Sequence, residues 1–152
     1  MGKSFQAVYN PFGTSAALKT LTDSYVADTN SYFLFRYCDA LTLECSFTTG
    51  SATGEFLDVQ IQLSNDPITN TPTNWYVWAP AIQADAAPAT MYDVSAVGFR
   101  VLMDLTTPAA NTNYKRSLTI NPESANWIKV LAKSSASANF GAAWIRVSVS
   151  GD

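Results

Sequence analysis

The stretch Leu57–Trp75, LDVQIQLSNDPITNTPTNW, decides the fold class of this 152-residue chain. Its first eight residues alternate between apolar and polar side chains, the two-residue period of a strand with one buried face and one solvent-facing side. The apolar positions are Leu57, Val59, Ile61 and Leu63, and the polar ones are Asp58, Gln60, Gln62 and Ser64. The run ends in SNDP at 64–67, residue types that favour a turn, and an aromatic strand follows at Trp75. The pattern predicts a hairpin of an antiparallel sandwich.

Comparable strand-like runs continue along the chain, separated by Gly, Pro, Asn and Ser. The expected strands cover 4–9, 32–38, 41–47, 56–63, 75–79, 95–103, 114–120, 126–132 and 143–149. We expect 32–38 and 41–47 to form a hairpin, 48–54 a flexible connection and 80–90 a surface loop. Many short strands with almost no helical period predict an all-β fold, an antiparallel two-sheet sandwich or jelly roll.

The first thirty residues differ from the rest because only their beginning alternates and 14–30 has no clean period. We therefore expect an extended N-terminal arm over 1–30 and a β-sandwich domain over 31–152. Such arms are often ordered by docking onto a neighbour. The apolar side chains that we expect to make partner contacts there are Phe5, Val8, Tyr9 and Phe12.

Composition narrows the function classes. Charged residues make up 14% of the chain against about 25% in typical domains, so Ser, Thr, Asn and Gln form much of the polar surface. Such a surface permits packing against neighbours, although β-proteins are in any case rich in Thr and Ser. The net charge of −3 without a basic tail disfavours nucleic-acid binding. No run approaches the roughly 20 apolar residues of a membrane span, and we expect a soluble protein made in a cytoplasm.

The residues that enzymes use most are scarce. The chain has no histidine, which removes Ser-His-Asp and Cys-His catalysis and the usual zinc ligand sets. Glu44 and Asp58 occupy positions that we expect to face solvent. Asn65-Asp66 suits a turn, with calcium binding as the weaker interpretation. We expect no catalytic residues, no cofactor and no metal.

The two cysteines, Cys38 and Cys45, lie on either side of the expected turn at Asp39-Ala40. In that register Cys38 is opposite Leu41, so the thiols are not opposite one another. We expect two buried, free cysteines.

The tryptophans allow two interpretations. Trp75 and Trp78, which we expect to share a face opposite to Tyr76, fill the core or else form an exposed platform for sugar rings. Trp144 shares a face with Arg146 and Ser148. We expect Trp144 to be partly exposed and to contact a partner.

Several of these segments together resemble small β-sandwich structural proteins of tailed bacteriophages. The similar pattern is LDVQIQLSND, the Thr/Asn loop and NWY, then SLTI at 117–120 and the closing pair NWIKVLA and AAWIRVSVSG. It covers roughly 56–150 and leaves out the N-terminal arm, and the loop at 67–73 is longer than in the pattern.

The resemblance implies a non-enzymatic virion protein, most of all a capsid decoration (cement) protein. The implied partners are further copies of the chain, as a homotrimer, and the major capsid protein. The implied location is the virion. A tail or head–tail connector protein is one alternative. A carbohydrate-binding module or the receptor-binding head of a tail fibre is the other, and only this one involves a sugar ligand.

Overall fold

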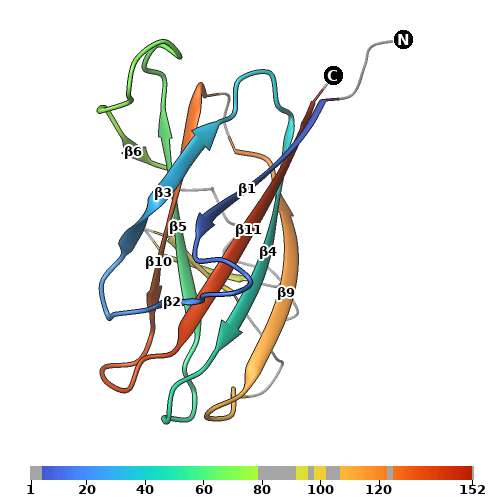
Figure 1. Ribbon diagram of the computed structural model, residues 1–152. Coiled ribbons are helices and arrows are strands. Elements are labelled where there is room, and N and C mark those ends of the chain that lie inside the picture. Colours follow the sequence, from blue (N-terminus) through green and yellow to red (C-terminus); the bar gives the residue numbers. More distant parts are fainter. Residues whose placement is uncertain (1–4, 79–91, 96–97, 102–106, 123–124, 152) are drawn as a thin grey trace.

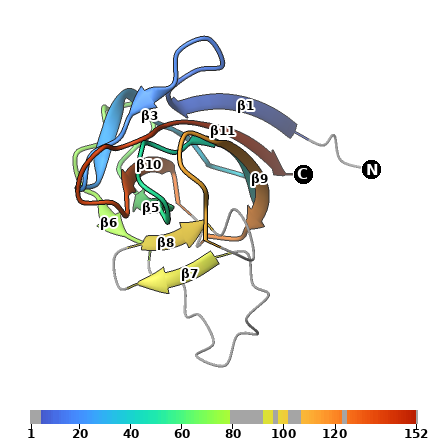
Figure 2. The ribbon, with the colours of Figure 1, turned by 90° about the horizontal axis from the view of Figure 1, so that it is seen from below.

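The computed structural model describes residues 5–78, 92–95, 98–101, 107–122 and 125–151. Within these ranges, only the backbone is described for Phe5, Asn30 and 92–95. These residues form strands, turns and bends and no helix. The strands lie in two antiparallel sheets, which confirms the all-β two-sheet sandwich (Figures 1 and 2). No helix in the described part is long and apolar enough to cross a membrane.

Sheet A has four main strands in a row and one short strand beside β11. In spatial order it consists of β1 (Phe5–Phe12), β11 (Ala142–Gly151), β4 (Ala40–Thr48) and β9 (Asn113–Ile120), with β2 (Lys19–Thr20) also paired to β11. Sheet B consists of β3 (Val26–Leu34), β10 (Trp127–Ser134), β5 (Leu57–Ser64), β8 (Gly98–Val101) and β7 (Tyr92–Ser95), with β6 (Tyr76–Val77) paired to β5. Seen from below in Figure 2, β1 and β11 lie on one side of the molecule and β7 and β8 on the opposite side.

The core fills the space between the sheets because each strand turns every second side chain inward. Its largest fully buried side chains are Phe12, Leu21, Phe35, Leu41, Leu43, Phe47, Leu57, Ile61, Leu63, Ile128 and Ile145. Tyr9 of β1 stacks on Phe33 of β3 with ring centroids 4.9 Å apart. This contact joins the edge strands of the two sheets on one side of the sandwich.

The segment 1–30 contributes strands to both sheets. β1 pairs with β11, and its register shifts between Tyr9 and Phe12, where Asn10-Pro11 interrupts the ladder. β3 begins at Val26 and runs through the expected boundary between residues 30 and 31. The division into an arm, 1–30, and a sandwich, 31–152, stays a prediction about domains.

The expected hairpin of 32–38 and 41–47 is wrong. β3 ends at Leu34 in sheet B, and β4 begins at Ala40 in sheet A. Tyr37, with φ of 67°, lies in the corner between them. A corner replaces the turn because Phe33 and Leu41 are both buried and approach the core from opposite sheets.

Strand β5 is central, and the expectation that its polar face is wet is wrong for Asp58, Gln60 and Ser64, all of which are buried. β10 and β8 flank β5, and Asp58 is only 6% exposed. Its carboxylate accepts a hydrogen bond from Nε of Arg100 on β8 at 2.9 Å. The hairpin from β5 to the aromatic strand is confirmed, although β6 has two residues. The strand expected over 95–103 is instead divided between β7 and β8, which pair with each other. The expected loop at 80–90 lies outside the described residues.

Both cysteines are free, as expected. Cys45 is buried in the core, and this burial raises the pKa of its thiol to about 12. Cys38 is only half-buried, so the expectation of two buried thiols holds for Cys45 alone.

The connection 48–54, expected to be flexible, is held by backbone and side-chain hydrogen bonds to the segment 108–112 and by one hydrogen bond to Glu55. This carboxylate is 1% exposed. One oxygen accepts the N–H of Gly50, and the other accepts the N–H of Gly141 at 2.8 Å and the hydroxyl of Ser134. A Cβ on Gly50 would lie 1.6 Å from the Asn139 carbonyl oxygen, so only glycine permits this approach. Glu55 thus joins both places where the chain crosses between the sheets at this end.

We predict that Glu55→Gln lowers the free energy of unfolding by about 1–3 kcal/mol, because the amide NH₂ would face a backbone N–H donor in a buried site. Glu55→Ala should cost more, since it leaves three donors without an acceptor. Urea unfolding of both variants measures this. The matched control is Glu44→Gln, whose exposed carboxylate pairs with Arg146 at 3.7 Å and should change stability by less than about 0.5 kcal/mol. A Glu55→Gln variant as stable as the parent would contradict the role of the carboxylate.

Candidate interaction surfaces

Most of the exposed large apolar side chains lie at one end of the molecule. Among the described residues they are Tyr32 and Leu34 of β3, Tyr37 in the corner after it, Ile68 before β6, and Tyr76 and Val77 of β6. Only Val8, on β1, is separate from this group. Figure 1 shows β6, the tip of β3, the start of β1 and the end of β11 at the same end of the molecule. An apolar surface gathered in this way is unusual for a protein that works alone.

The outer face of sheet B explains how this surface is built. Register pairs Leu34 with Trp127 and Tyr32 with Lys129, and on the other side of β5 Val77 is opposite Gln62. The Tyr32 ring lies 6.0 Å from that of Trp75 and packs edge-on against that of Trp127 at 5.8 Å. We call Tyr32, Leu34, Trp75, Val77 and Trp127 the aromatic patch.

One cation lies within the aromatic patch. The Lys129 ammonium sits 4.4 Å from the centre of the Trp75 ring, where the electron-rich face of the indole attracts it. Burial lowers the pKa of Lys129. The patch therefore presents mainly apolar surface, with one partly buried charge that holds Trp75 over the sheet.

Asp66 fixes the connection that carries Trp75 and Ile68. Its carboxylate accepts the backbone N–H groups of Thr73 and Asn74 at 2.7 and 2.9 Å and the side-chain amide of Asn74 at 2.9 Å. Its carbonyl oxygen accepts the indole N–H of Trp127 at 3.2 Å. These bonds agree with the turn interpretation of Asn65-Asp66. Across the described ranges, no three His, Cys, Asp or Glu side chains gather as a metal site would require.

We predict that the Asp66 carboxyl titrates near pH 2. Hydrogen bonds from the Asn74 side chain and from the backbone of Thr73 and Asn74 stabilise the charged form and lower its pKa to about 2. The stability that Asp66 contributes is complete above its unfolded pKa of about 4 and is lost as the pH falls through the folded value. Carbon-13 NMR of the carboxyl groups measures the midpoint. A midpoint near 4 would show that the connection is not held in this way.

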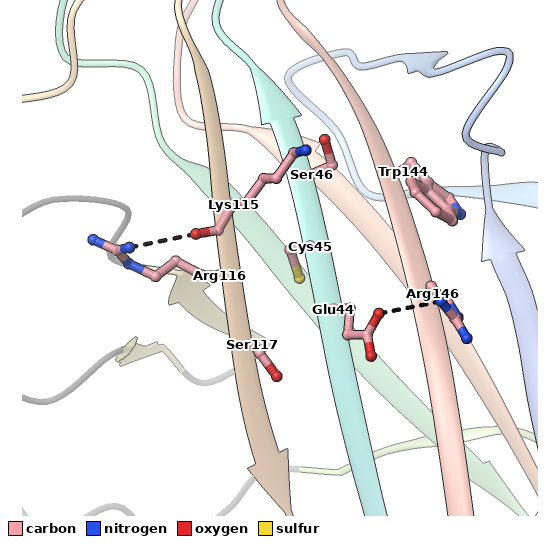
Figure 3. A pocket seen from close by; sticks show the side chains of 8 residues that line it. All are labelled: Glu44, Cys45, Ser46, Lys115, Arg116, Ser117, Trp144 and Arg146. Carbon is pink, nitrogen blue, oxygen red and sulfur yellow. Dashed lines mark hydrogen bonds and ion pairs between the residues drawn. The ribbon is translucent and has the colours of Figure 1, made fainter.

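The outer face of sheet A is polar and hollowed over β4. Two neighbouring cross-strand rows form it: Lys115, Ser46 and Trp144 in one, and Ser117, Glu44 and Arg146 in the other. The short serines lie beside long side chains, and this leaves a hollow of about 450 Å³ (Figure 3). We call it the β4 groove. A second hollow of about 330 Å³, lined partly by Val8, Thr42 and Ser148, continues it, and Arg146 borders both.

Two contacts set the walls of the β4 groove. The Trp144 indole N–H donates to the Asn10 side-chain oxygen at 2.8 Å, which ties the ring to β1. Arg146 pairs with Glu44 at 3.7 Å, and both side chains are more than 40% exposed. Arg116 borders the groove, but its guanidinium points to the other side of β9, where it donates to the Lys115 carbonyl oxygen.

The structure separates the residues expected to make partner contacts. Val8 is 50% exposed, whereas Phe12 is completely buried and belongs to the core. Tyr9 is half-buried against Phe33. The backbone of Phe5 pairs with Gly151, and its side chain lies outside the described part. Trp144 is half-buried in the β4 groove.

Trp75 and Trp78 do not form a pair. The two-residue period of a strand puts positions 75 and 78 on opposite faces. Trp75 lies on the outer face beside Lys129, and Trp78 packs partly buried against the core. The shared face expected for Trp75 and Trp78 is therefore wrong, and the alternative of a sugar platform built from both rings fails with it.

Sequence reasoning missed Tyr32, Leu34 and Trp127 as surface residues. The signal was present in SYFLF at 31–35, where every residue after Ser31 is apolar. A strand that is apolar on both faces, in a sheet with one face toward the core, must expose the other set. Here Phe33 and Phe35 are buried, and Tyr32 and Leu34 are exposed.

Comparison with known proteins gives the following similarities. No protein-family model and no curated protein matches the chain. The crystal structure of the infectious bursal disease virus VP2 subviral particle aligns over 98% of this chain with 13% identity and a TM-score of 0.45. The structure of the Gx strain of that virus aligns over 99% with 15% identity and a TM-score of 0.45. The chain spans 33% of the length of each of these structures. Because both TM-scores are below 0.5, we assign the two-sheet antiparallel sandwich from the strand pairing of the chain itself.

Proposed function

We propose that the chain is a non-enzymatic structural protein of a virus particle, a decoration (cement) protein of the tailed-phage type. It forms a homotrimer and binds the major capsid protein. The aromatic patch is the docking surface. The Phe5 position adds contacts from β1, whose first residues lie at the same end of the molecule.

The observation that carries the proposal is the composition of the aromatic patch. Tryptophan and tyrosine are enriched in the cores of protein interfaces, and lysine and glutamate are depleted there. The patch combines two tryptophans, one tyrosine and two aliphatic side chains. Tyr32, Leu34 and Val77 are 38–41% exposed, so a partner removes apolar surface from water when it covers them.

Parts of the remaining surface are polar but uncharged, which suits contacts with neighbouring subunits. Beside the charged rows of the β4 groove, Ser and Thr make up much of the outer face of sheet A, and the hydroxyls of Thr42 and Thr119 hydrogen-bond to each other at 3.0 Å. Uncharged groups that already have partners are cheap to desolvate compared with lysine or glutamate. Close packing beside other subunits therefore costs little.

A decoration protein stabilises the shell through mass action. A protein that binds the assembled shell and not the free subunits shifts the equilibrium toward the intact shell. Single contacts of modest strength suffice, because a trimer binds through several contacts at once.

We predict that the double variant Leu34→Lys, Val77→Lys lowers the affinity for shells at least about tenfold, because two charges at opposite sides of the patch would be desolvated within the contact. Co-sedimentation with capsid shells of the virus that encodes the chain measures the affinity. The parent and variant should unfold at nearly the same temperature, since both positions are exposed.

The matched control is Thr20→Lys, Thr29→Lys, which adds the same charge at exposed positions outside the aromatic patch. It should bind as the parent does. Equal binding by the Leu34→Lys, Val77→Lys variant would show that the patch does not dock, and absence of binding by the parent would refute the decoration role.

A further inference from the structure

We infer that the β4 groove binds an acidic saccharide, a sugar chain that carries carboxylates. The groove lies on the outer face of sheet A, and the aromatic patch lies on the outer face of sheet B. The two surfaces therefore face opposite ways. This site does not depend on the proposed decoration function.

The charge of the groove selects an anion. Lys115 and Arg146 extend over it against the single carboxylate of Glu44. Arg146 shares its charge with Glu44 at 3.7 Å, whereas no carboxylate in the described part of the chain forms an ion pair with Lys115. The Lys115 ammonium is thus available to a ligand carboxylate, to which it donates a charge-assisted hydrogen bond.

The other groups in the groove select a sugar over a simple anion. Glu44 accepts hydrogen bonds, and the hydroxyls of Ser46 and Ser117 both donate and accept, which suits a ligand with many hydroxyl groups. Trp144 supplies an aromatic wall on the β11 side, against which the apolar face of a sugar ring can pack. An acidic peptide such as tetraglutamate would engage the cations as well, but it has no apolar ring face to pack against Trp144.

The dimensions favour an oligosaccharide. The hollow over β4 is about 450 Å³, and its continuation along β1 and β11 adds about 330 Å³ lined by further polar groups such as Gln6 and Ser148. Because Arg146 borders both hollows, an acidic oligosaccharide that extends from the first hollow into the second would pass the Arg146 guanidinium.

Isothermal titration of the full chain with tetragalacturonic acid at low salt tests the site. We expect saturable binding, about tenfold weaker for the neutral, fully methyl-esterified tetragalacturonate, which keeps the same sugar backbone but lacks the charge-assisted bonds. Raising the salt concentration should weaken uronate binding. No saturable binding of the uronate, or equal binding of the neutral sugar, would overturn the assignment.

Three variants and one peptide complete the test. Lys115→Gln should weaken uronate binding about tenfold and Trp144→Ala should weaken both sugars, whereas Lys133→Gln, a lysine near the Tyr25 ring on sheet B, should change neither. The urea unfolding midpoint of Lys115→Gln should equal that of the parent, because the side chain is exposed. Unchanged uronate binding by Lys115→Gln, or equal binding of tetraglutamate, would overturn the saccharide assignment.

Discussion

The buried carboxylate of Glu55 is the interaction on which the arrangement of the two sheets depends. The chain passes from sheet A to sheet B between β4 and β5, and back between β10 and β11. Glu55 hydrogen-bonds to Gly50 in the first crossing and to Ser134 and Gly141 beside the second. All three partners donate hydrogen bonds, so both buried side-chain oxygens of Glu55 have partners. The sheets are thereby fixed at one end, and their outer faces are free for different tasks.

Those outer faces differ in chemistry because their strands differ in pattern. β3 carries apolar side chains on both faces, so Tyr32 and Leu34 remain outside when Phe33 enters the core. β4 alternates strictly, with Leu43 and Cys45 inside and Glu44 and Ser46 outside. Sheet B therefore presents an apolar patch suited to a protein partner, and sheet A presents a polar groove suited to a hydroxylated ligand. One small sandwich can in this way bind two partners on opposite sides.

The local sequence pattern predicted the fold class and most strands, because a strand with one buried face alternates between apolar and polar residues. The prediction of burial and of chain connections failed where these depend on residues that are distant in the sequence. Asp58 looks solvent-facing in sequence, and only the pairing of β5 with β8 brings Arg100 to it. The corner at Tyr37 looks like a hairpin turn because both flanking strands are apolar. Of the residues expected to contact a partner, Val8 and Trp144 are at least partly accessible and Phe12 is not, since the β1 register rather than its composition decides which β1 side chains enter the core.

Electron cryomicroscopy of virus particles carrying the bound chain would show the orientation of the sandwich on the shell. We predict copies grouped in threes, with Trp75 and Trp127 against the capsid protein and the β4 groove directed outward. Density with the aromatic patch facing solvent, or with sheet A against the shell, would contradict it.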